Sequence, residues 1–282
     1  MNFWDRMQDI DVRIIYIVIF LVCTIAVIKP LGLPIAISNT TVQAFETMDS
    51  LEPGDVVWLD AAYSPGSESE LNPMVLAVAH HAFKKDLRVV TFALWNMGQK
   101  LVQPLIKDRA EHFGKEYGVD WVNLGYRPAS LMVLRAMRDG ISDAVGGVDD
   151  FGTPLTELPL VDPGNPNAVL ELNDKYVDLI VVFETGSPGT VDYLTYVALE
   201  YDIPIFPALV QVSVPGALAY VQSGDYSGLI PGLRGAAEYQ ILAGAPPTAA
   251  TGTDAQSLGA LAITAFIILG NLGYLLGRKN AA

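Results

Sequence analysis

The chain has 282 residues, 51% of them apolar, and a formal net charge of −14. This apolar share is too high for an ordinary soluble domain, and the excess lies at the two ends of the chain. Between those ends 12 basic residues stand against 28 acidic ones, a balance of about −16. Such a negative field disfavours binding to nucleic acid, so no nucleic-acid partner is expected. The single cysteine, Cys23, excludes an intramolecular disulfide.

An apolar segment near the N-terminus predicts a membrane anchor. Residues 14–28 are uncharged and apolar, and a second apolar piece at 31–37 follows Lys29 and Pro30. Together the two pieces reach the length of a membrane helix, which needs about 20 apolar residues. A cleavable signal peptide is the alternative, because its apolar core is also short. Since the preceding charges are mixed and no clear A-x-A site is present, we predict an uncleaved anchor within residues 1–37.

Short apolar runs alternate with helical patterns in the central part of the chain. This alternation is typical of strands that are buried on both faces of a parallel sheet. We therefore predict a Rossmann-like, doubly wound α/β domain with a mostly parallel sheet at residues 38–244, in the common strand order 3-2-1-4-5. A Gly-, Pro- and Asp-rich stretch at about 146–166 predicts an irregular insertion, and the residues before the first strand are expected to be a tether. The predicted strands are 56–59, 89–94, 119–124, 179–183 and 203–209, and the predicted helices lie near 70–85, 103–117, 129–139, 190–201, 215–223 and 232–243.

A second membrane helix is predicted at the C-terminus, within residues 257–282. Residues 258–276 are uncharged and lead into a basic pair, Arg278 and Lys279. The preceding residues, 245–256, are rich in Ala, Pro, Thr and Gly and predict an extended spacer. Because basic residues flank the outer ends of both apolar segments, the positive-inside rule predicts an integral membrane protein with cytoplasmic termini and an extracytoplasmic central domain.

Glycines recur along the second apolar segment. The spacing Gly-x-x-x-Gly from Gly273 to Gly277 would let another helix approach closely in the lipid bilayer, as in a homo-oligomer. Glycine is frequent in membrane helices in general, so this spacing alone does not identify a partner helix.

Polar residues follow the predicted strands at the edge where doubly wound sheets bind ligands. Asp60 and Glu184 end neighbouring strands, where two carboxyl groups can act as acid and base or hold a cation. Alternatively, each caps a loop or pairs with Arg127. The catalytic candidates are Asp60, Ser64, Arg127 and Glu184, and the candidates for ligand binding are Tyr63, Ser67, Asn96, Tyr126, Thr185 and Ser187.

Two Ser-Pro-Gly turns, at 64–66 and 187–189, connect the first and fourth predicted strands to helices. Each would place backbone N–H groups at a helix N-terminus, which suits an anion such as phosphate. Ser67 and Glu70 nevertheless fit a capping box, in which a helix satisfies its own donors, and Asp192 occupies the second helix end. We therefore favour helix capping over phosphate binding.

Sequence signatures of known chemistry are missing. The chain has no G-x-G-x-x-G after a strand, no phosphate-binding P-loop, no G-x-S-x-G and no H-E-x-x-H. His80 and His81 are adjacent in a predicted helix and point about 100° apart, one toward the sheet and one toward solvent, which is poor geometry for a metal. With His112 on a polar helix face, no metal site is expected and no cofactor is assigned.

Two classes of function are compatible with this pattern. We predict a non-catalytic component of a membrane protein assembly, whose anchored α/β domain binds a partner protein or a small ligand. The alternative is a membrane-anchored enzyme, a hydrolase or transferase, with its site at the carboxyl ends of the strands. A closed, packed strand-end edge favours the first class, whereas a deep cleft with converging polar groups favours the second.

Overall fold

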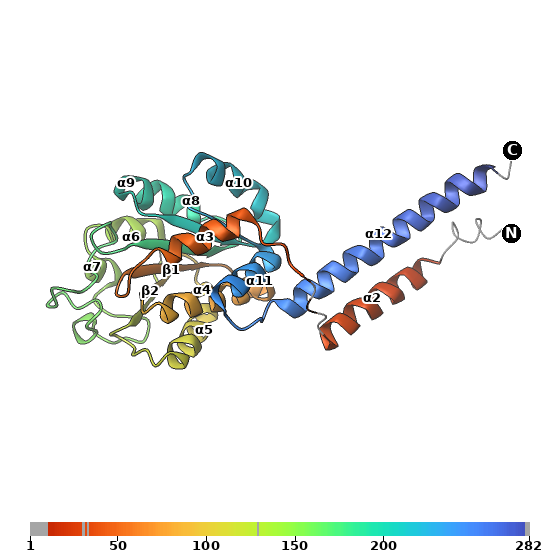
Figure 1. The fold of residues 1–282 in the computed structure, drawn as a ribbon. Helices are drawn as coiled ribbons and strands as arrows, with labels where there is room; N and C mark the ends of the chain where they lie inside the picture. Colours follow the sequence, from red (N-terminus) through yellow and green to blue (C-terminus); the bar gives the residue numbers. More distant parts are fainter. Residues whose placement is uncertain (1–10, 30–31, 33, 129, 280–282) are drawn as a thin grey trace. The chain divides into compact units, whose positions relative to one another are not determined.

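A computed structural model of the chain describes residues 11–29, 32, 34–128 and 130–279 (Figure 1). Its residues fall into two compact units. One unit comprises Ile35–Pro247, and the other comprises the described parts of Met1–Pro34 and Thr248–Ala282. Each unit is considered by itself below.

The larger unit is built on a six-stranded sheet in which every pair of neighbours is parallel. The strand order is β3-β2-β1-β4-β5-β6, which confirms the predicted Rossmann-like arrangement and adds one strand to it. The added strand has only two residues, too few for a recognisable apolar run. The strands are β1 (Val56–Ala62), β2 (Arg88–Ala93), β3 (Trp121–Tyr126), β4 (Leu179–Glu184), β5 (Ile205–Leu209) and β6 (Ile230–Pro231).

Helices cover both faces of this sheet, as connections between parallel strands require. Helices α4 and α5 contact the strands on one face. Side chains from α6 to α10 join the core cluster on the other face. The helices of this unit are α3 (Asn39–Asp49), α4 (Glu68–Lys84), α5 (Gly98–His112), α6 (Ser130–Ala136), α7 (Ile141–Val145), α8 (Thr190–Tyr193), the π-helical η3 (Leu194–Ala198), α9 (Leu199–Tyr201), α10 (Val214–Ser223) and α11 (Gly232–Ala243), with short 3₁₀ turns η1 (Pro65–Ser67), η2 (Leu155–Glu157) and η4 (Gln211–Ser213).

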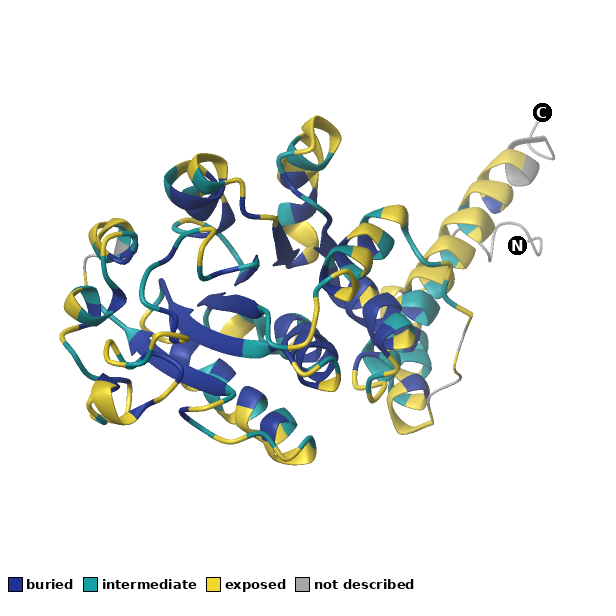
Figure 2. Ribbon diagram, turned by 60° about the vertical axis from the view of Figure 1, so that its left-hand side comes forward, coloured by how far each residue is buried: buried dark blue, intermediate teal, exposed yellow. Residues whose placement is uncertain are grey.

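The strands form the centre of the core, and Figure 2 shows them buried almost throughout. All seven residues of β1 and all five of β5 are buried. Along β1 the side chains alternate between the two faces, so that Trp58 and Ala62 belong to the core cluster beneath α6 to α10. Asp60 lies between them in the strand, and the alternation places its side chain on that same face.

Helix α3 corrects the prediction of a tether before the first strand. Ala44 and Met48 are fully buried, and α3 contacts both α11 and β6. Gly228 permits this packing, because a Cβ at that position would collide with the backbone of Ala44. The many Thr, Gln and Asn side chains of α3 hide its narrow apolar stripe in the sequence.

The predicted insertion at 146–166 is largely irregular, but it is not a peripheral loop. Leu155, Leu158, Leu160 and Val161 all enter the core cluster. A bridge between Val148 and Pro154 and the short turn η2 are its regular elements among the described residues.

The smaller unit contains two apolar helices, α2 (Val12–Ile28) and α12 (Ala250–Lys279), which pack side by side in opposite directions (Figure 1). Residues Ala250–Leu275 are long and apolar enough to cross a membrane, whereas α2 has 17 residues. The continuation predicted at 31–37 is not helical where it is described; Pro30, Leu31 and Leu33 lie outside the described residues. Because α12 begins at Ala250, the second half of the predicted extended spacer is helical instead.

Close contacts join these two helices. Cys23 Sγ lies 3.8 Å from the carbonyl oxygen of Ala255, and a Cβ at Gly259 would lie 3.3 Å from the same sulfur. Beyond the end of α2, the Gly32 N–H donates to Asp254 Oδ2 at 2.9 Å. Gly259 is therefore used in packing within this chain, whereas Gly270 has open space where its side chain would be.

Candidate functional site

The carboxyl ends of β1 and β4 bring Asp60 and Glu184 to the same region of the sheet. In the parallel register Asp60 pairs with Val182, and Glu184 pairs with Ala62. Because alternate residues share a face, Asp60 and Glu184 lie on one face of the sheet, two residues apart along neighbouring strands. The sequence prediction that these carboxyl groups belong to adjacent strands is confirmed by this register.

Asp60 is the centre of a buried hydrogen-bond network. Its Oδ2 accepts from the Tyr193 hydroxyl at 2.9 Å and from the Leu94 N–H at 3.0 Å. The Trp58 indole N–H donates to the same Tyr193 oxygen at 3.0 Å. Burial raises the pKa of Asp60 well above its ordinary value, and the nearby carboxylate of Glu184 adds to this shift. Oδ1 of Asp60 has no hydrogen-bond partner among the described residues.

Glu184 is half-buried at the end of β4, where its Oε2 accepts a hydrogen bond from the N–H of Thr190. Burial raises its pKa from 4.5 to about 7; the Thr190 N–H lowers it and Asp192 raises it further. A Cβ at Gly189 would collide with Glu184 Oε2, so glycine is required for the turn to close over this carboxyl group. A glutamate with this pKa can take up or release a proton near neutral pH.

The second Ser-Pro-Gly turn is held in place by two further hydrogen bonds. The Trp95 indole N–H donates to the carbonyl oxygen of Pro188 at 2.8 Å. The Gly189 N–H donates to Asp192 Oδ2 at 2.8 Å. Together with the bond between Thr190 and Glu184, this leaves the first donors of α8 occupied by the protein's own carboxylates, in agreement with capping rather than phosphate binding.

The first Ser-Pro-Gly turn does not form the predicted capping box. Residues 65–67 make the 3₁₀ turn η1, and Ser67, at φ −113° and ψ 4°, makes no side-chain hydrogen bond to the helix. An N-cap side chain needs an extended backbone to reach the helix donors, and this turn removes it. Glu70 instead accepts from the Gln211 N–H at 2.9 Å and so joins α4 to the turn after β5.

Arg127 pairs with neither Asp60 nor Glu184, contrary to the alternative considered from the sequence. Its guanidinium donates to the carbonyl oxygens of Val145 at 2.9 Å, Val148 at 2.8 Å and Tyr126 at 3.1 Å. Arg127 thus ties the end of β3 to the start of the insertion. A guanidinium suits this role, because its planar set of donors satisfies several carbonyls at once.

The remaining candidate residues differ in their burial and in their hydrogen bonds. The hydroxyl of Tyr63 is occupied by Asn72 at 2.8 Å, and the Thr185 N–H donates to the Ala62 carbonyl oxygen at 3.1 Å. Ser64, Ser67, Thr185 and Tyr126 are half-buried, whereas Asn96 and Ser187 are exposed. Trp58 and Tyr193, which complete the Asp60 network, carried no signal in the sequence because each lies within an apolar strand or helix.

Exposed apolar side chains occur at this same edge, in the turns after β2 and β5 and at the start of α8 after β4. Met97 after β2 is 44% exposed, Val191 after β4 is 45% exposed, and Val212 after β5 is 85% exposed. Each follows the carboxyl end of a different strand, so the three lie along one edge of the sheet. Sequence reasoning singled out the polar residues of these turns and missed these apolar ones.

The histidines differ from the prediction, because both His80 and His81 are buried. His81 lies between the Tyr239 hydroxyl, 2.9 Å from Nδ1, and Asp49, 3.3 Å from Nε2. Burial lowers the pKa of His81 to about 4, so the ring is neutral at physiological pH. Within the described part of the chain, no group of three or more His, Cys, Asp or Glu residues is arranged to hold a metal ion.

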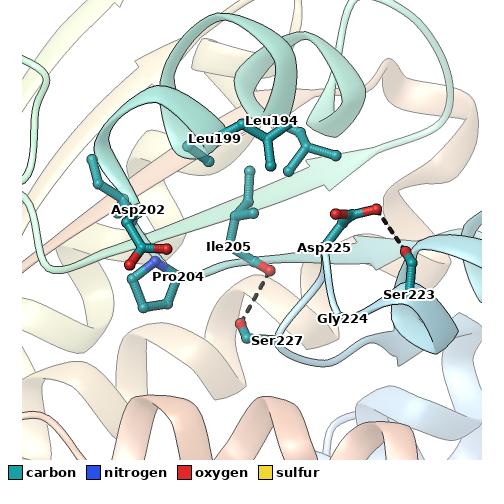
Figure 3. A pocket seen from close by; sticks show the side chains of 11 residues that line it. Leu194, Leu199, Asp202, Pro204, Ile205, Ser223, Gly224, Asp225 and Ser227 are labelled. Atoms are coloured by element: carbon teal, nitrogen blue, oxygen red, sulfur yellow. Dashed lines mark hydrogen bonds between the residues drawn. The ribbon is translucent and has the colours of Figure 1, made fainter.

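Four surface hollows of the domain have volumes of about 260 to 500 Å³. The hollow in Figure 3, of about 370 Å³, lies at the amino end of β5 between Leu194, Asp202 and Asp225. The largest of the four lies between α10 and α11 and includes Gln211 and Arg234. None of these four is lined by Asp60 or Glu184, or by either Ser-Pro-Gly turn.

Comparisons with models of known families, with characterised proteins and with solved structures found no match.

Proposed function

We propose that the protein is a membrane-anchored binding module, a non-catalytic component of a membrane assembly, which binds a partner protein at the carboxyl edge of its sheet. The proposal rests on the contrast between polar and apolar side chains in the segments that follow the strands. Several of their polar groups bond to one another, while Met97, Val191 and Val212 are exposed to solvent. Surfaces that combine apolar side chains with a polar surround are typical of protein interfaces.

The turns at this edge are also held in position before any partner binds. Trp95 holds Pro188, and Glu70 holds Gln211. A preorganised surface loses less conformational entropy on binding than a mobile loop does. Rigid turns with exposed apolar side chains therefore suit binding better than they suit a role as plain connections.

The proposed anchor consists of both apolar helices. Although α2 alone is short, it packs against α12, and the two together form an antiparallel pair with apolar residues on its surface. Phe20 and Leu261, for example, are both exposed, which favours a lipid environment over water. With two spans and the basic residues at their outer ends, we place both termini in the cytoplasm and the domain outside it.

Site-specific photocrosslinking in native membranes tests the proposed edge. A photoreactive amino acid at position 191 or 212 is expected to form adducts with another polypeptide. Position 119 is the matched control, because Val119 is 43% exposed but precedes β3 at the opposite edge of the sheet. Equal adduct formation at 119 and 191, or none at 191 and 212 in a folded protein, would contradict the proposal.

A membrane-anchored hydrolase or transferase remains the second candidate, and one observation favours it. A carboxyl group with a pKa of about 7, such as that of Glu184, suits general acid–base catalysis. If Glu184 is catalytic, Glu184→Gln will fail to restore the phenotype of cells that lack the protein, although the variant accumulates normally and keeps its crosslinks at 191. If binding is the function, the same variant will fail to restore the phenotype only where its crosslinks at 191 also change.

A further inference from the structure

Asp60 and Glu184 lie beneath the same short helix. Tyr193 of α8 donates its hydroxyl to Asp60, and Thr190 donates its backbone N–H to Glu184. Since Thr190 and Tyr193 are three residues apart, one helical turn covers both carboxyl groups. Movement of this turn would change the solvent access of both.

The groups around this pair are acidic or neutral. Asp192 and Tyr193 face it from α8, and Tyr226 faces it from the turn before β6. None of the interactions that shift the pKa values of Asp60 and Glu184 comes from a Lys, Arg or His. Two carboxylates buried without a cation are strongly disfavoured, so burial of the pair requires protons.

Asp60 has a site for such a proton. Its Oδ2 accepts both hydrogen bonds, while Oδ1 is fully buried and unpartnered among the described residues. Glu184 is nearer to solvent and bonds to the turn itself. These positions separate the two groups: Asp60 is enclosed, and Glu184 can exchange a proton with the solution.

We propose that Asp60 and Glu184 form a proton-binding carboxyl pair, and that loss of the proton from Glu184 opens the Ser-Pro-Gly turn at residues 187–189. In the closed turn Gly189 lies directly against Glu184, so water can surround an ionised Glu184 only if the turn moves away. Trp95 then remains as the tether of Pro188.

Proton linkage gives the direction and the size of the effect. The pKa of Glu184 is about 7 in the closed turn and near 4.5 once the side chain is in water. Closing therefore takes up a proton, and the opening equilibrium rises with pH across this range, by at most about 300-fold. Val191 lies two residues beyond the turn, so opening also alters the binding edge; this last consequence rests on the proposed function.

Hydrogen exchange of the full-length protein in mild detergent tests the proposal. After correction for intrinsic exchange, opening of residues 185–193 should increase about 10- to 30-fold between pH 5.5 and pH 8.5. In Glu184→Gln, which cannot ionise, these residues should stay protected at both pH values. The internal control is the turn at 149–153, where the Asp149 carboxylate accepts from the N–H groups of Phe151 and Thr153. Equal opening at both pH values in the native protein, or the same rise in Glu184→Gln, would overturn the proposal.

Infrared titration of the native protein provides a test that needs no folded variant. A protonated carboxyl band should be present at pH 6 and lose the intensity of one group as the pH rises past about 7. Absence of such a band at pH 6 would overturn the proton-binding pair.

Crosslinking from position 191 at pH 6 and pH 8.5 separates the two proposals. If adducts form at 191 but hydrogen exchange does not depend on pH, the proposed opening of the turn is contradicted and the proposed binding edge is still supported. A pH-dependent opening without adducts at 191 or 212 supports the switch and contradicts the binding edge.

Discussion

Replacement of Glu184 by Gln should make the domain more stable at alkaline pH. Glutamine keeps the shape of the side chain, and its carbonyl oxygen can still accept from the Thr190 N–H. What it removes is the cost of a buried negative charge. At pH 8.5 native Glu184 is ionised, whereas at pH 5 it is largely protonated in the folded protein.

The magnitude follows from the shift of the pKa. The pKa of Glu184 rises from 4.5 to about 7 on folding, and each pKa unit corresponds to about 1.36 kcal/mol. Above pH 7 the ionised group therefore lowers the free energy of unfolding by at most about 3 kcal/mol. The group is only half-buried, and the new amide N–H₂ must find partners. We therefore expect Glu184→Gln to raise the free energy of unfolding at pH 8.5 by about 1–2 kcal/mol.

The sign of the pH dependence is fixed by the same shift. A carboxyl group whose folded pKa is raised contributes stability that is fully present below about pH 4.5 and is lost as the pH rises through about 7. Asp60 acts in the same direction, but it is present in both proteins. His81, whose pKa is lowered, acts in the opposite direction but is likewise present in both proteins. The stability of Glu184→Gln relative to the native protein should thus increase between pH 5 and 8.5.

Urea unfolding of the full-length protein in mild detergent, followed by tryptophan fluorescence at pH 5 and pH 8.5, measures this difference. Glu70→Gln is the control, because Glu70 also accepts from a backbone N–H but lies away from the carboxyl pair. Glu70→Gln should change the free energy of unfolding by a similar amount at pH 5 and at pH 8.5. An equal change of stability with pH in the native protein and in Glu184→Gln would refute the reasoning.

Three further outcomes are expected. Gly189→Ala should lower the melting temperature, because the new Cβ would collide with the carboxyl group of Glu184. Gly186→Ala, which has open space at that position, should leave the melting temperature nearly unchanged. An unchanged melting temperature for Gly189→Ala would contradict the closed turn. Met48→Ala should cost about 2–5 kcal/mol in urea unfolding, as for other buried side chains, and a loss below about 0.5 kcal/mol would mean that α3 is not part of the core. Gly259→Val should speed alkylation of the Cys23 thiol, because the larger side chain would separate α2 from α12. Gly270→Val should leave the alkylation rate unchanged. Equal alkylation rates in the two variants would argue against the packing of these helices.

The main sheet could be predicted because its strands are buried on both faces. A run such as Leu179–Glu184 is almost continuously apolar and is flanked by helical patterns, so its type and its neighbours follow from local sequence and the rules of parallel sheets. Helix α3 and strand β6 could not be recognised in this way. The first has a narrow apolar stripe among polar residues, and the second has two residues.

The candidate site was predictable in position but not in its bonding. Asp60 and Glu184 could be placed together because strand ends determine where such residues meet. Tyr193, which donates to Asp60 and accepts from Trp58, comes from a helix 133 residues further along the chain than Asp60, and no local pattern encodes that contact. Ser67 shows that a local motif can also mislead. Ser67 and Glu70 match the capping-box pattern, but the backbone forms a 3₁₀ turn and Ser67 does not cap the helix.

The bond between Glu70 and the turn after β5 also has a mechanical consequence. In the sheet β1 and β5 are not neighbours, because β4 lies between them, yet this carboxylate joins α4, which follows β1, to Gln211 beyond β5. A pull on the turn that carries Val212 would therefore load α4 as well as β5. This bond spans the width of three strands, so the turn after β5 is coupled to the helix after β1 without passing through β4.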